Sequence, residues 1–104
     1  MVSYLYGWEK LHLAIHSLAG EGTCKERLIS AVVCHLVHIT PDRDLPEEIR
    51  KEFAQFMKDI TSVTATRNEG TAHATVDAMS ASDVDRAVSR IISFYGTVCS
   101  KEPF

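Results

Sequence analysis

The chain has 104 residues, enough for one domain, and its 45% hydrophobic and 24% charged residues are ordinary for a globular protein. The formal net charge of −3 counts against a nucleic-acid partner, whose phosphates require a basic surface. No run of about 18 apolar residues occurs, so we expect no membrane span. The three cysteines lack zinc-site spacing, and the N-terminal residues do not resemble a signal peptide. These features predict a single cytoplasmic domain over residues 1–104.

Four stretches of the chain share one apolar spacing, in which successive residues lie alternately four and three positions apart. This spacing places the side chains on one stripe of a helix. The sequence therefore predicts an all-α fold, an antiparallel four-helix bundle whose stripes share a core. The stripes comprise Tyr4, Trp8, Leu11, Ile15 and Leu18; Leu28, Val32, His35 and Ile39; Ile49, Phe53, Phe56, Ile60 and Val63; and Val84, Val88, Ile91, Tyr95 and Val98.

The first two helices are predicted to form a hairpin. The first begins near Leu5 and ends at the glycines of the Gly20–Gly22 segment, where glycine tolerates a left-handed conformation. The second begins at Thr23, which forms a capping box with Glu26, and continues to about Ile39. The short connection favours antiparallel neighbours.

The other two long helices are delimited by capping residues. Asp44 is the predicted N-cap of a helix that continues to about Ser62. Either Ser80 or Ser82 caps the last helix, and Gly96 is its predicted end. Between them, residues 64–79 are too many for a structureless loop in a compact domain, so a short fifth helix is expected from residue 71 onward.

Five histidines are many for this length, and four of them lie on the first two helices. His12 and His16 are four positions apart, and His35 and His38 are three apart, so each pair lies on one side of a helix. In an antiparallel hairpin His12 and His35 are offset by only about 6 Å along the axis, which predicts a two-ligand metal site. The alternative is that His35, in a stripe position, is a neutral buried core residue.

His16 lies outside the apolar stripe and is expected to be exposed. The segment around it resembles the phosphorylated-histidine motif of histidine phosphotransfer domains, which are helical bundles of similar size. His16, Ser17, Leu18 and Gly20 match that motif, whereas Ala19 replaces its lysine. The resemblance implies a phosphoacceptor at His16, without the cation expected beside the phosphoryl group.

The first two helices carry more apolar residues than their stripes require. A helix that is apolar over so wide an arc is either central in its domain or in contact with another subunit. We therefore expect a homodimer, or another protein partner, at this surface. Alternatively, the segment 72–79 folds back over the second helix. The predicted interface consists of Leu5, Tyr6, Leu13, Ile29, Val33 and Val37.

Other catalytic patterns are missing from the sequence. It contains no glycine-rich phosphate loop, no serine nucleophile elbow and no repeated Glu-x-x-His element of a di-iron bundle. The favoured function is therefore a non-enzymatic interaction or regulatory module without a cofactor. A site centred on the histidines is the alternative.

Overall fold

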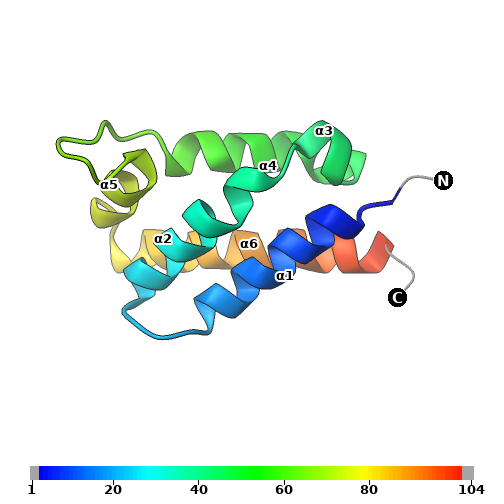
Figure 1. Ribbon diagram of the computed structural model, residues 1–104, viewed down its shortest axis with the longest axis horizontal. Coiled ribbons are helices and arrows are strands. Elements are labelled where there is room, and N and C mark those ends of the chain that lie inside the picture. The colour runs from blue at the N-terminus through cyan, green and yellow to red at the C-terminus, as the bar shows by residue number, and fades with distance from the viewer. Residues whose placement is uncertain (1–2, 102–104) are drawn as a thin grey trace.

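The computed structural model describes residues 3–101, which form helices and no strand (Figure 1). The all-α prediction is confirmed, whereas the arrangement as an antiparallel four-helix bundle stays a prediction. In this part of the chain no helix is both long and apolar enough to cross a membrane. The elements are α1 (Leu5–Leu18), α2 (Cys24–Cys34), the 3-10 helix η1 (Leu36–His38), α3 (Pro41–Asp44), α4 (Glu47–Ile60), α5 (Thr71–Asp77) and α6 (Ala81–Lys101).

Helices α4 and α6 follow the long axis of the molecule, and α1 and α2 cross in front of α6 (Figure 1). Helix α1 packs mainly against α2 and α6, and the short α5 packs against α2 and α4. The end of α1 that comes first in the chain and the last turn of α6 lie at the same end of the molecule (Figure 1).

The core is apolar and is centred on aromatic contacts between α4 and α6. Phe94 packs edge-to-face on Phe53 and on Phe56, with ring centroids 5.4 Å and 5.8 Å apart. The buried hydrophobic residues are Leu11, Ala14, Leu28, Ala31, Val32, Leu36, Ile39, Leu45, Ile49, Phe53, Phe56, Ile60, Ala72, Val76, Val84, Ala87, Ile91, Phe94 and Val98.

Two predicted helix starts are confirmed by their hydrogen bonds. The Thr23 side chain accepts a bond from the Glu26 N–H at 3.1 Å, and the Glu26 carboxylate accepts one from the Thr23 N–H at 3.0 Å. Ser80 accepts from the Asp83 N–H at 3.1 Å and so caps α6. Both pairs satisfy backbone donors that the helix itself leaves free.

Helix α2 ends five residues before the predicted end at Ile39. The backbone of His35 leaves the helical conformation, with φ −128° and ψ −57°, and one 3-10 turn follows. Residues three apart eclipse in a 3-10 helix, so Leu36 and Ile39 both turn into the core. The core position that the stripe assigned to His35 is thus occupied by Leu36.

The prediction that Asp44 caps the third long helix is wrong. Pro41 begins the earlier helix α3, because a proline is well suited to the first turn, and Asp44 ends this helix. The buried Asp44 carboxylate accepts bonds from the Thr40 N–H at 2.7 Å and from the Arg43 guanidinium at 3.0 Å. Burial acts to raise the pKa of Asp44, but these hydrogen bonds and the Arg43 charge outweigh it, so that the pKa is lowered.

Gly96 does not end the last helix, which continues to Lys101. A helix-ending glycine takes a positive φ, and within residues 3–101 only Gly22 and Gly70 do so. The expected fifth helix is present, with Gly70 at its N-cap position. Gly96 is therefore an interior helical residue.

Gly7 permits a close contact between α1 and the chain at the end of α3. A Cβ atom at this position would overlap the carbonyl oxygen of Asp44 and lie 3.3 Å from the Leu45 Cδ2. Backbone atoms cannot move aside as a flexible side chain can. The contact thus requires a residue without a side chain.

We predict that Gly7→Ala lowers the free energy of unfolding by about 1–3 kcal/mol, because α1 must shift away from α3. Gly96→Ala is the matched control, since a Cβ there meets nothing within 4 Å. It should raise the stability by up to about 1 kcal/mol through helix propensity. Urea denaturation followed by circular dichroism measures both, and equal effects of the two substitutions would contradict the close contact.

Candidate functional site

Two histidines and two aromatic residues gather where α1 meets α6. His12 stacks on Trp8, with ring centroids 4.7 Å apart and planes 17° from parallel. On its other side, the His12 Nε2 lies 3.2 Å from the His16 Nε2. The His12 Nδ1 lies 3.0 Å from the Tyr95 Oη of α6. We call these four residues the His12 cluster.

The helical period of α1 assembles three members of this cluster. Trp8, His12 and His16 follow one another at four-residue spacing, which places their side chains in a row. Tyr95 comes from the opposing helix and closes the row on one side. His12 is consequently held by contacts to both nitrogens and to one ring face, whereas His16 lies at the exposed end.

The hydrogen bonds of the cluster couple the tautomers of its two imidazoles. The two Nε2 atoms share one hydrogen, so one ring donates and the other accepts. If His12 carries its hydrogen on Nε2, then its Nδ1 accepts from the Tyr95 hydroxyl. If it carries the hydrogen on Nδ1, the hydroxyl oxygen accepts and His16 donates to His12. The cluster supports either orientation with all contacts satisfied.

The phenol of Tyr95 remains protonated at neutral pH. Partial burial raises its pKa, as do the hydrogen bond with Cys99 and the negative charge that the thiol acquires on ionisation. A hydrogen bond with Trp8 acts in the opposite direction but does not prevail. The hydroxyl can thus both donate and accept beside His12.

The structure pairs His12 differently from the sequence prediction. The Nε2 of His35 lies 3.1 Å from the Ser17 Oγ, while His12 contacts Trp8, His16 and Tyr95. Within residues 3–101, no group of three or more His, Cys, Asp or Glu side chains could hold a metal ion. The His12 and His35 side chains therefore serve separate contacts.

His35 is half-buried, and burial lowers its pKa, as do the nearby charges of Lys10 and His38. His16 is exposed, in accordance with its position outside the stripe. The neighbouring Ser17 hydroxyl is engaged by His35. The segment that resembles the phosphotransfer motif thus presents its histidine on the surface of α1.

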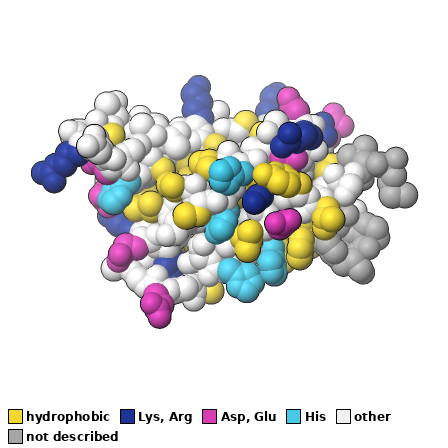
Figure 2. Space-filling model, in the orientation of Figure 1, with side chains coloured by type: hydrophobic (Ala, Val, Ile, Leu, Met, Phe, Trp, Pro, Cys, Tyr) yellow, Lys and Arg dark blue, Asp and Glu magenta, His cyan; other side chains and the backbone are white. Residues whose placement is uncertain are grey.

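Hydrophobic side chains and histidines gather together on the face formed by α1 and α2 (Figure 2). Among the predicted interface residues, Leu5, Tyr6, Val33 and Val37 are between 44% and 53% exposed. Leu13 and Ile29 are half-buried, and Ile29 packs against the core. Most of the excess apolar surface predicted on these helices therefore reaches solvent within one chain.

The outer side of α2 and η1 carries an uncharged stripe. Three of its members lie three and four positions apart on α2 and so follow one side of that helix, the other two follow on η1, and all five are exposed. None of them has a formal charge when histidine is neutral. We call this set the α2 stripe; it consists of Ser30, Val33, Cys34, Val37 and His38.

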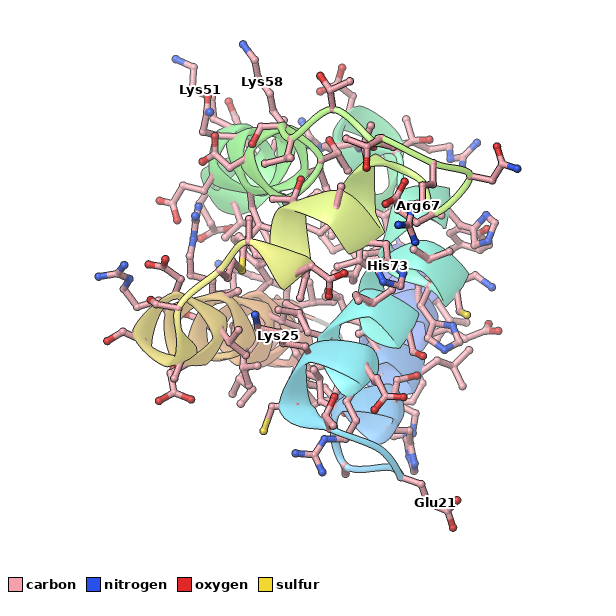
Figure 3. All side chains as sticks on the ribbon, turned by 90° about the vertical axis from the view of Figure 1, so that its left-hand side faces the viewer. Glu21, Lys25, Lys51, Lys58, Arg67 and His73 are labelled. Atoms are coloured by element: carbon pink, nitrogen blue, oxygen red, sulfur yellow. The ribbon has the colours of Figure 1, made fainter. Side chains whose placement is uncertain are left out.

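The short helix α5 covers α2 only in part. It packs against α2, and Lys25 extends from α2 to donate a bond to the Asp77 carbonyl oxygen at 2.8 Å (Figure 3). His73 of α5 is paired with Asp77 at 3.0 Å. The α2 stripe nevertheless stays exposed. The alternative in which residues 72–79 cover the second helix therefore holds for one side of α2.

The lowered pKa of His35 predicts a pH dependence of stability. Above about pH 6.5, His35 is neutral in both the folded and the unfolded chain. As the pH falls below this value, the unfolded chain binds a proton at His35 before the folded chain does. The free energy of unfolding therefore decreases until the pH reaches the lowered pKa of His35 in the folded chain. We expect the melting temperature to fall between about pH 7.5 and 5.5, and to fall less in His35→Gln. Scanning calorimetry measures the difference, and equal slopes would contradict the assignment. The lowered pKa of Asp44 affects stability only at lower pH, as the pH falls below the ordinary aspartate pKa of 3.8.

Sequence reasoning identified His12 and His16 but missed Trp8 and Tyr95 as their partners. Both had been assigned to apolar stripes, and the four-residue spacing of Trp8, His12 and His16 was the signal that could have linked them. Comparison of the chain with protein-family models, with curated proteins and with solved structures found no match. Any inference about the function of this chain must therefore come from the arrangement of its own side chains.

Proposed function

We propose that the chain is a non-enzymatic interaction module, an antiparallel helical bundle that self-associates through α1, α2 and η1. The exposed, uncharged α2 stripe is the observation that supports this proposal. Val33 and Val37 are 48% and 49% exposed at its centre. Burying two such side chains against another chain removes apolar surface from water, which favours association.

A second copy of the chain is the partner that the stripe fits best. In a twofold interface each patch meets the same patch, so a charged patch would meet charges of its own sign. The α2 stripe avoids this repulsion when His38 is neutral, because its other members carry no ionised side chain at neutral pH. Leu5 and Tyr6 supply further exposed apolar surface on α1, which packs against α2. The predicted assembly is a homodimer.

We predict a dimer mass for the full chain at about 50 micromolar, a concentration well above the dissociation constant of a weak specific contact. Val33→Glu places two like charges in the interface and should weaken the dimer at least tenfold, or about 1.4 kcal/mol. Sedimentation equilibrium measures both constants. A wild-type chain that is monomeric at this concentration would overturn the proposal.

The matched control is Ile92→Glu. Ile92 is also an exposed hydrophobic residue, at 52%, but it lies on α6. This substitution adds the same charge and removes a side chain of similar size, so it should leave the dimer intact. A dimer weakened equally by both variants would assign the loss to net charge and would count against the α2 stripe.

Phosphoryl acceptance at His16 is the second candidate, favoured by the exposure of this imidazole. The wild type, incubated with acetyl phosphate or a histidine kinase, should then gain an acid-labile phosphoryl group, and His16→Asn should lose it. Mass spectrometry at alkaline pH detects the modification. No incorporation into the wild type, or equal incorporation into the variant, would reject this candidate.

A further inference from the structure

We propose that His12 and His16 form a two-histidine site for a divalent transition-metal ion on the surface of α1. Both residues use Nε2, and the remaining coordination positions are open to water or to an added ligand. The ion belongs to the class that prefers imidazole, such as Ni²⁺, Cu²⁺ or Zn²⁺. This inference is independent of self-association, because both ligands come from one helix of one chain.

The separation of the two nitrogens matches the requirement of a single ion. Zinc–imidazole bonds measure about 2.0–2.1 Å, so two ligands at angles between square and tetrahedral are roughly 2.9–3.4 Å apart. The two Nε2 atoms are 3.2 Å apart. This distance fits one ion, and each lone pair must turn by roughly 35–45° from the line between the two nitrogens to point at it.

Tyr95 supplies the outer contact that a metal-binding histidine usually has. A ligating imidazole donates its second ring N–H to an oxygen atom, which fixes its tautomer and orientation. Metal binding at Nε2 requires the hydrogen of His12 on Nδ1, and the Tyr95 Oη lies 3.0 Å from that atom. The phenol oxygen accepts this hydrogen, while the hydroxyl hydrogen of Tyr95 rotates away from His12.

The change between metal-free and metal-bound states conserves protons. In the metal-free chain, one of the two neutral rings carries its hydrogen on Nε2. On binding, this ring exchanges its hydrogen through solvent for one on Nδ1, so neither imidazole loses net hydrogen. Both Nε2 atoms then have a free lone pair that can bind the ion. Stacking on Trp8 keeps His12 oriented throughout.

The site differs from other histidine positions in this chain in having two imidazoles in contact. His73 is engaged by Asp77, and His35 is in contact with Ser17. His38 is exposed on η1. These histidines serve as internal controls.

Titration of the untagged full chain with Ni²⁺ alone, followed by isothermal calorimetry, tests the site. We expect one equivalent of Ni²⁺ per chain and a melting temperature that rises with its concentration. His16→Asn should weaken binding at least tenfold, and the exposed position of His16 lets this variant fold. Tyr95→Phe keeps both ligands but removes the outer contact, and should weaken binding about tenfold or more.

Control variants separate this site from other sources of binding. His38→Asn should retain the wild-type affinity, because His38 lies on η1, outside the His12 cluster, and is not a ligand in the proposal. Val33→Glu should also retain it, so that loss of the dimer and loss of the metal are distinguishable. Binding that survives His16→Asn unchanged, or that depends instead on His35 or Cys99, would overturn the two-histidine site.

Discussion

The orientation of α1 depends on the contact between Gly7 and the backbone of Asp44. Because Gly7 has no side chain, α1 approaches the end of α3 closely, and the same face of α1 buries Leu11 and Ala14. This rotation of the helix leaves Trp8 and His12 on the side toward α6. It places Tyr6 near α3, where the Arg43 guanidinium lies 5.7 Å from the ring centroid. One close contact therefore determines which residues of α1 meet each neighbour.

Asp44 has a matching role on the other side of this contact. Its carboxylate closes the turn around Pro41 by accepting the Thr40 N–H, and Arg43 compensates its charge. A buried carboxylate without such partners would be costly. The turn that carries the Asp44 carbonyl oxygen is thus held by side-chain hydrogen bonds, and α1 packs against a backbone that has little freedom to yield.

The apolar spacing predicted the helices and much of the core, but it placed the centres of two stripes incorrectly. On α1 the buried positions are Gly7, Leu11 and Ala14, whereas Trp8 is only partly buried. On α6 Phe94 is buried and Tyr95 is partly buried. Small residues permit close helix contacts, and large apolar residues at the margin of a stripe can be half-buried. A hydrophobicity pattern weights the large residues and therefore shifts the inferred centre toward them.

The partners of His12 could not be found from sequence for a different reason. Hairpin geometry relates α1 only to α2, its neighbour in the chain, and therefore predicts His35 as the partner of His12. The hydrogen-bond partner of His12 is Tyr95, 83 positions away in the chain. The rotation of α1 brings the two side chains together. The 3-10 turn after Cys34 also moved His35 out of its stripe, and this break depends on how Leu36 and Ile39 fill the core. Both are consequences of tertiary packing.

The position of the His12 cluster also determines what a bound ion would do to the fold. Structural zinc sites join segments that remain unfolded without metal. Here both proposed ligands lie on a single helix, and the residues that hold His12 belong to helices packed around an apolar core. Binding would thus stabilise a chain that is already folded, by mass action alone. Because Trp8 and Tyr95 hold His12 while His16 is exposed, one ligand is preorganised and the other can adjust. Such a site is suited to reversible exchange of its ion or of an added ligand, rather than to a permanent structural role.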